Sequence, residues 1–185
     1  MLQETFNDIE DRMQKTLEAA AREFGRTRTG RATPELVENI QVDAYGSKMP
    51  LNQLGSIAIP QPRIIKISPF DQGNLNAIEK AISTSDLGIQ PRNDGNFIIV
   101  EIPALTEERR KDLVKVVKKK GEEMKVALRN VRRDGNDEVK LLESEKEISE
   151  DEKERGLKQI QEITDKYTEK LDDMIEKKEQ EIMEF

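Results

Sequence analysis

Basic side chains are concentrated in one stretch of this 185-residue chain. Residues 109–133 contain 11 Lys or Arg and three Asp or Glu, whereas the whole chain has a net charge of −7. Charges in salt solution are screened over about 10 Å, so the local excess decides what a nearby polyanion experiences. Arginine pairs with phosphate through a planar fork, and lysine offers a point charge. The stretch therefore predicts contact with a nucleic-acid backbone.

Helical spacing places these basic residues on one face. At about 100° per residue, with Lys111 at zero, they fall between about 300° and 40°; they are Lys111, Lys115, Lys118, Lys125, Arg129, Arg132 and Arg133. The apolar residues fall between about 140° and 260°; they are Leu113, Val116, Val117, Met124, Ala127, Leu128 and Val131. If the apolar face packs, the basic face must point to solvent. Lys120 falls within the apolar face, where we expect its stem to be buried and its ammonium group to reach water.

A solvated helix face is the ordinary explanation for a run of charges. Here the face carries one sign apart from Glu122, and its end, Arg129–Arg133, is rich in arginine. These two properties favour a phosphate-binding surface.

The composition argues against most enzyme classes. The chain has no histidine and no cysteine, which excludes Ser-His-Asp and Cys-His chemistry, imidazole and thiolate metal sites, and disulfides. Aromatic residues make up 4% of the chain and tryptophan is absent, so base-stacking platforms are scarce. We therefore expect a binding or mechanical protein without a cofactor or metal.

Three further motifs do not qualify as binding or catalytic sites. Gly25–Ala32 has the glycine spacing of a phosphate-binding P-loop, but Arg31 and Ala32 replace its lysine and its Ser/Thr. The acidic residues after position 149 alternate with lysines, which predicts intrahelical ion pairs and a solvated face. The run Asp134–Asp137 lacks the calcium-loop pattern, and its Gly135 predicts a slight bend in the helix.

Three long helices are expected to carry the basic face. Apolar residues recur at steps of three and four over 2–24, over about 106–143 and from the capping box at Ser149 onward. Thr106 is a candidate N-cap for the second helix. Long helices are stabilised mainly by packing of an apolar face, so the three stripes predict a three-helix bundle.

The segment between the first two helices follows a different pattern. Six of the seven prolines lie between Pro34 and Pro91, with β-rich runs at 40–45, 56–59, 63–68 and 97–102 and a short helical pattern at 74–84. Thr33–Val37 is a further short helix candidate, and Asn93–Asn96 predicts a turn. The prediction is an α+β, mainly α fold: a bundle from 1–29 and 106–185, with an inserted β/α/β domain at 30–105.

Two short crossings join these parts. We expect a movable hinge there, with Gly30 and Arg31 in the first crossing and Pro103, Ala104 and Leu105 in the second. A rigid elbow is the alternative. A double connection of this kind restricts twisting and permits bending.

Five motifs, in order and at this length, resemble the bacterial ribosome recycling factors. They are Arg28–Ala32, Asp86–Gly88, Leu105–Leu113, Arg129–Asp134 and Ile148–Glu152. The resemblance implies an L-shaped molecule whose bundle lies on large-subunit rRNA and whose small domain is mobile and faces elongation factor G. It implies that the chain, with this GTPase and GTP, splits the post-termination ribosome into subunits and releases mRNA and tRNA.

The resemblance also implies which residues bind rRNA. Arg110, Arg129 and Arg132 match RNA-contacting arginines of the family, and Arg28 and Arg31 lie in its crossing motif. Lys118, Lys125 and Arg133 on the basic face complete the predicted rRNA site. Gly135 departs from the family pattern, where alanine is frequent.

The remaining expectations concern partners and location. The first residues, Met1–Glu4, show no signal-peptide pattern, so we expect a cytoplasmic protein, monomeric and without membrane contact. The alternative from another class is a coiled-coil interaction scaffold without RNA binding. It predicts an exposed apolar strip and self-association.

Overall fold

A computed structural model describes residues 1–184. Within them the chain forms two compact units, one of Met1–Thr27 with Lys111–Glu184 and the other of Arg28–Arg110. No helix in the described part of the chain is both long and apolar enough to cross a membrane.

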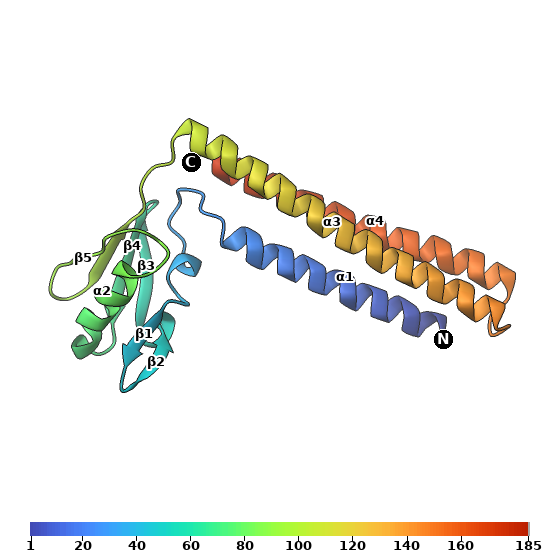
Figure 1. The fold of residues 1–185 in the computed structure, drawn as a ribbon, viewed down its shortest axis with the longest axis horizontal. Helices are drawn as coiled ribbons and strands as arrows, with labels where there is room; N and C mark the ends of the chain where they lie inside the picture. The colour runs from blue at the N-terminus through green and yellow to red at the C-terminus, as the bar shows by residue number, and fades with distance from the viewer. Residues whose placement is uncertain (185) are drawn as a thin grey trace. The chain divides into compact units, whose positions relative to one another are not determined.

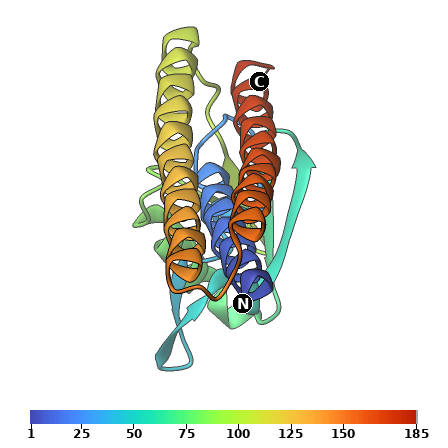
Figure 2. The same cartoon turned by 90° about the vertical axis from the view of Figure 1, so that its right-hand side faces the viewer.

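The first unit is a bundle of three helices, which Figures 1 and 2 show running side by side. They are α1 (Leu2–Gly25), α3 (Glu107–Ser144) and α4 (Glu150–Glu184). The apolar stripes predicted from the sequence face inward. Ile9, Met13, Leu128, Ile160 and Leu171 are at most 1% exposed. One expected core residue differs, because Val116 is 43% exposed and lies at the edge of the stripe.

The predicted helix starts have the expected capping bonds. Thr106 Oγ1 accepts a hydrogen bond from the amide of Arg109 at 3.2 Å. At the start of α4, the Ser149 hydroxyl accepts from the Glu152 amide at 3.2 Å, and Glu152 Oε2 accepts from the Ser149 amide at 2.7 Å. This reciprocal pair is a complete capping box.

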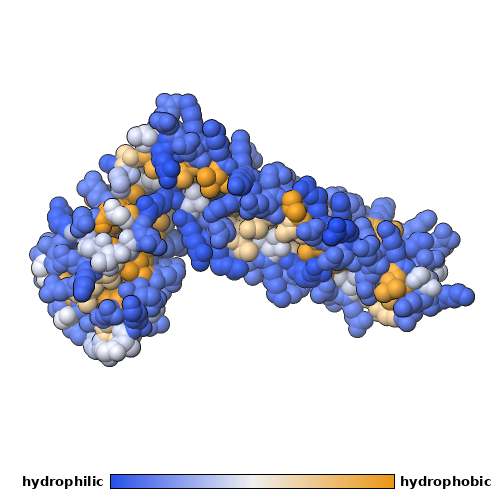
Figure 3. Space-filling model, in the orientation of Figure 1, coloured by the Kyte–Doolittle hydropathy of each residue, from blue (hydrophilic) through white to orange (hydrophobic). Residues whose placement is uncertain are grey.

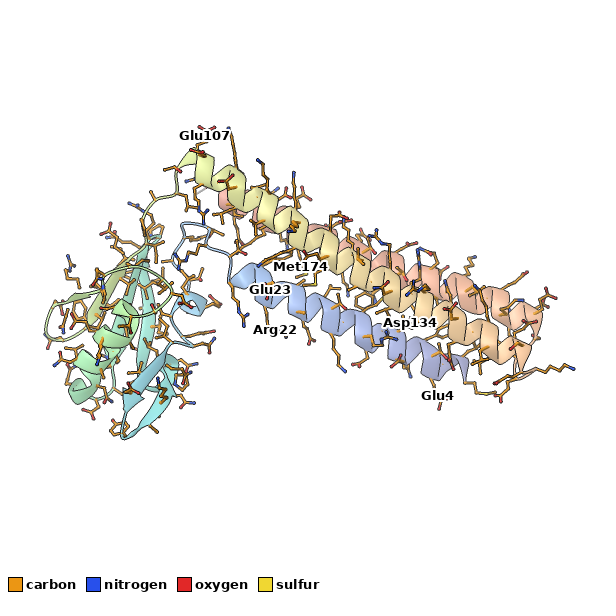
Figure 4. All side chains as sticks on the ribbon, in the orientation of Figure 1. Glu4, Arg22, Glu23, Glu107, Asp134 and Met174 are labelled. Carbon is orange, nitrogen blue, oxygen red and sulfur yellow. The ribbon has the colours of Figure 1, made fainter. Side chains whose placement is uncertain are left out.

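Gly135 does not interrupt α3. The helix is continuous from Glu107 to Ser144, and Gly135 is buried against α1. A Cβ at Gly135 would lie 2.2 Å from Ile9 Cδ1, so the glycine makes room for the Ile9 side chain. Gly121 likewise makes room for Ile175 of α4, since a Cβ at Gly121 would lie 2.4 Å from Ile175 Cδ1. Asp134, labelled in Figure 4, accepts a hydrogen bond from Arg12 of α1 at 2.6 Å.

The second unit contains an antiparallel four-stranded sheet in the order β3-β4-β6-β5. Its strands are β3 (Gly55–Gln61), β4 (Ile64–Pro69), β5 (Arg92–Asn93) and β6 (Ile98–Glu101). A hairpin of β1 (Gln41–Ala44) and β2 (Ser47–Pro50), helix α2 (Leu75–Ser83) and three short 3-10 helices at Pro34–Leu36, Leu51–Gln53 and Gln72–Asn74 complete it. Strand β2 was not predicted, because Ser47–Pro50 contains no β-branched or aromatic residue and shows no strand pattern.

This unit has its own hydrophobic core. Ile65 and Ile67 of β4, Ile98 and Val100 of β6, and Ile78 of α2 are fully buried together. The turn between β1 and β2 places Tyr45 at a φ of 50° and Gly46 at 77°, as a two-residue hairpin turn requires. The Tyr45 hydroxyl donates to Asp71 at 2.9 Å and accepts from Asn74 at 3.1 Å, which ties the turn to the start of α2.

Candidate nucleic-acid interface

The basic face of α3 is exposed because the opposite, apolar side of the helix packs in the bundle. Because Leu113, Val117, Leu128 and Val131 are buried in the bundle, the opposite side of the helix is left to solvent. Lys115, Lys118, Arg129 and Arg133 are all exposed. Figure 3 shows the visible side of the bundle as largely hydrophilic, with separate apolar patches.

Lys125 differs from these exposed residues, because its side chain is partly buried and ion-paired. Its Nζ lies 2.7 Å from Asp172 Oδ1 of α4 and 3.5 Å from Glu122 Oε1, and its side chain is 26% exposed. The hydrogen bond to Asp172 raises the pKa of Lys125, with burial opposing it. A phosphate would have to compete with two carboxylates for this ammonium group, so Lys125 is the least available of the predicted lysines.

Arg132 also contacts α4, but its partner there is the neutral side chain of Gln161. Its Nη1 donates to Gln161 Oε1 at 3.3 Å, and the residue is half-buried. Arg132 and Lys125 lie on the same edge of the predicted face, at about 300° and 320° on the helical wheel. Gly121 lies near 280°, so this is the edge on which α4 packs.

Lys120 reaches an ion pair, not water alone. Its Nζ lies 2.9 Å from Glu23 Oε2, near the end of α1. This hydrogen bond lowers the pKa of Glu23. The labelled Glu23 in Figure 4 marks this end of α1. The pair explains how a lysine lies on the packed side of α3.

The predicted residues of the first crossing belong to the second unit, not to the bundle. Arg28 donates to the backbone carbonyl of Asp86, and the amide of Ala32 donates to Pro62 O at 2.8 Å. Arg31 is exposed. Arg110 is half-buried and is likewise grouped with this unit. The eight predicted rRNA-binding residues are therefore divided between the two units.

The two crossings approach each other at one predicted hinge residue of each, Gly30 and Leu105. Gly30 has a φ of 79°, and a Cβ there would lie 3.1 Å from Leu105 Cγ. Pro103 and Ala104 are exposed beside Leu105. All five hinge residues lie within the second unit, whose borders fall at Thr27/Arg28 and Arg110/Lys111.

Within the described part of the chain, the Asp and Glu side chains are not clustered as metal ligands. Among residues 1–184, no three Asp or Glu are placed to hold an ion together. Some acidic residues of α4 instead pair with neighbouring side chains: Asp172 with Lys125 of α3, Glu181 with Lys178, and Asp165 with Gln161 on the same helix. Sequence patterns did not identify Gln161, Asp165 or Asp172 as neighbours of the basic face, because their roles depend on how the two helices pack.

Comparison with known proteins decides the family. The family model described as "Ribosome recycling factor" matches residues 20–183. The chain belongs to the ribosome recycling factor family.

Its similarity to ribosome recycling factors extends over the whole chain. The factor of Carboxydothermus hydrogenoformans is 51% identical over 183 residues, covering 99% of both chains. That of Halalkalibacterium halodurans is 50% identical over 184 residues, covering 100% of both. A solution structure of a ribosome recycling factor matches with a TM-score of 0.82 and 44% identity, over 100% of this chain and 98% of that one.

A second solved structure adds a functional context. It has a TM-score of 0.69 and 46% identity, and it covers 98% of each chain. It describes the Thermus thermophilus ribosome recycling factor and Escherichia coli elongation factor G on the E. coli post-termination complex. Family and structural likeness together confirm the predicted family and the mainly helical fold with a small β-containing part.

Proposed function

We propose that this chain binds the post-termination ribosome and, together with elongation factor G and GTP, separates it into subunits. The family, a group of non-enzymatic translation factors, supports this role. So does a related structure described with elongation factor G on the post-termination complex. A bacterial factor of this kind works in the cytoplasm, where its ribosomes are.

The exposed cations of α3 carry the proposal. RNA in a folded ribosome presents mainly phosphates and 2′-hydroxyls, which a row of Lys and Arg can bind without aromatic stacking. Lys118, Arg129 and Arg133 are exposed on one continuous helix whose opposite side is packed in the bundle. In this proposal the bundle holds large-subunit rRNA, with Arg132 at its edge and Lys125 in a secondary role.

The second unit is proposed to receive the force from elongation factor G. It has its own core and two chain crossings, which are the conditions for movement as one body. Arg28, Arg31 and Arg110 add cations beside the crossings. The free energy comes from GTP hydrolysis by the partner.

Cosedimentation with ribosomes over a salt series tests the rRNA contact. We expect Arg129→Ala to weaken binding and to lower the slope of log K against log salt by about 1, because one phosphate contact is lost. Lys177→Ala, an exposed change on α4, serves as the matched control. Wild-type affinity and slope in Arg129→Ala would remove Arg129 from the interface.

Light scattering of ribosomes with elongation factor G and GTP tests the splitting step. A crosslink between the two units should leave ribosome binding intact and stop splitting. Splitting at the wild-type rate in the crosslinked protein would refute a moving second unit.

A further inference from the structure

A chain of side-chain hydrogen bonds joins α3 to α4 at Arg132. Arg132 Nη1 donates to Gln161 Oε1 at 3.3 Å, and Gln161 Nε2 donates to Asp165 Oδ1 at 2.7 Å. Gln161 and Asp165 lie one turn apart on α4, so their side chains are neighbours on one helix face. The chain therefore runs from a carboxylate, through an amide, to a guanidinium group.

Asp165 determines which end of the Gln161 amide faces Arg132. An amide has one accepting oxygen and one donating NH₂ group, and it can rotate to present either. The Asp165 carboxylate only accepts hydrogen bonds, so it selects the rotamer with Nε2 on its own side. Gln161 Oε1 is then left pointing to Arg132, whose guanidinium only donates. Without Asp165, the amide could turn its NH₂ group toward the guanidinium, where two donors would meet.

The neutral partner distinguishes Arg132 from Lys125. Lys125, on the same edge of α3, is paired directly with the Asp172 carboxylate at 2.7 Å. The partner that contacts Arg132 is an amide, and the carboxylate lies one residue further along the chain of bonds. An amide orients a guanidinium without cancelling its charge. Because arginine has five N–H donors, others stay available for phosphate oxygens.

We propose that Gln161, oriented by Asp165, is a positioning residue that fixes the guanidinium of Arg132 for phosphate binding while leaving its positive charge uncancelled. This inference rests on the proposed rRNA contact of α3. Ordering a long side chain before binding removes part of the entropy cost of association, an effect on affinity of about 2- to 10-fold for one side chain.

Ribosome binding of the full-length chain over a salt series tests the role of Gln161. We expect Gln161→Ala to weaken binding about 2- to 10-fold with an unchanged salt slope, because the phosphate contact remains but is less ordered. Gln161→Glu should weaken it further and lower the slope by about 1, because a carboxylate would then neutralise Arg132. Gln159→Glu, which adds the same charge at an exposed α4 position, is the control.

Asp165 is tested with a matched change in charge. Asp165→Ala, which removes the acceptor for Gln161 Nε2, should bind more weakly than Asp173→Ala, which raises the net charge equally at another exposed α4 position. Equal affinity of these two variants would show that Asp165 does not orient the amide.

A double-mutant cycle separates positioning from a structural effect. In the Arg132→Ala background, Gln161→Ala should have no further effect on binding, and urea unfolding midpoints should show that each variant is folded. The inference is overturned if Gln161→Ala has the same effect with and without Arg132, or no effect while Arg132→Ala weakens binding. If Arg132→Ala itself binds like the wild type, the proposed phosphate contact of Arg132 fails, and the inference fails with it.

Discussion

Gly135→Ala tests the close packing of α3 against Ile9 of α1 and Ile160 of α4. Alanine forms helices better than glycine by about 1 kcal/mol, so an exposed helical glycine gains stability from this change. At Gly135, however, the new Cβ would lie 2.2 Å from Ile9 Cδ1, 3.0 Å from Ile9 Cγ1 and 3.4 Å from Ile160 Cδ1. Ile9 and Ile160 are at most 1% exposed, so the new Cβ would meet side chains that are already packed inside the bundle.

The two effects can be compared in magnitude. Carbon atoms in contact lie about 3.5–4.0 Å apart, so the overlap with Ile9 exceeds about 1 Å. Overpacking of this kind costs about 1–3 kcal/mol. After the gain of about 1 kcal/mol from helix propensity, we expect Gly135→Ala to lower the free energy of unfolding by about 0–2 kcal/mol.

A second substitution makes the test decisive. Ile9→Val removes the Cδ1 atom that is closest to the new Cβ and alone costs about 0.5–1.5 kcal/mol. In the Ile9→Val background, Gly135→Ala should become neutral or stabilising by up to about 1 kcal/mol. Urea unfolding followed by circular dichroism at 222 nm measures all four proteins. Gly25→Ala is the control, because no atom lies within 4 Å of its Cβ. Equal effects of Gly135→Ala in both backgrounds would refute the packing explanation.

Three other substitutions test local backbone geometry and capping. Gly30→Ala should destabilise the second unit by more than the about 1–2 kcal/mol expected for a left-handed residue alone, because the new Cβ would also meet Leu105. Gly88→Ala is the control, since Gly88 has a φ of 64° and no atom within 4 Å of the added Cβ. Thermal unfolding should show a smaller loss of stability for Gly88→Ala than for Gly30→Ala, and equal losses would contradict the contact with Leu105. Ser149→Ala should cost about 1 kcal/mol at pH 7. Hydrogen bonds from the Ser149 amide and hydroxyl lower the pKa of Glu152, so the stabilisation that the Glu152 carboxylate contributes is present above the ordinary glutamate pKa of about 4.3 and is lost as pH falls through the lower folded value. Unfolding curves between pH 7 and 2 should show Glu152→Ala less stable than the wild type at pH 7 and the two approaching each other in acid, and a pH-independent difference would contradict the hydrogen bonds to Glu152.

Much of the bundle could be predicted because each helix has one uninterrupted apolar stripe. The same periodicity that buries Leu128 places Arg129 in solvent, so the basic face followed directly from the sequence. In the second unit, strands with β-branched residues such as Ile65 and Ile67 were recognisable. Strand β2 was missed because Ser47–Pro50 contains no β-branched or aromatic residue. The strand is defined by its pairing with β1.

The contacts between helices could not be predicted from periodicity. The stripe assigns Lys125 and Arg132 to the solvent face, but α4 packs along one edge of it and supplies Asp172 and Gln161. Gly135 suggested a weak point, whereas the structure uses it to accommodate Ile9. A glycine in register with a buried stripe is a signal for close helix packing that could have been used.

The helical glycines have a mechanical consequence for the bundle. Gly121 faces Ile175, Gly135 faces Ile9, and Gly156 lies against Leu2 and Val139. If one helix slid lengthwise by a turn, each of these bulky side chains would meet another side chain where it now meets a bare backbone. Shear between the helices is therefore resisted at three heights, and the bundle should carry a load applied at one end to the other as a stiff rod.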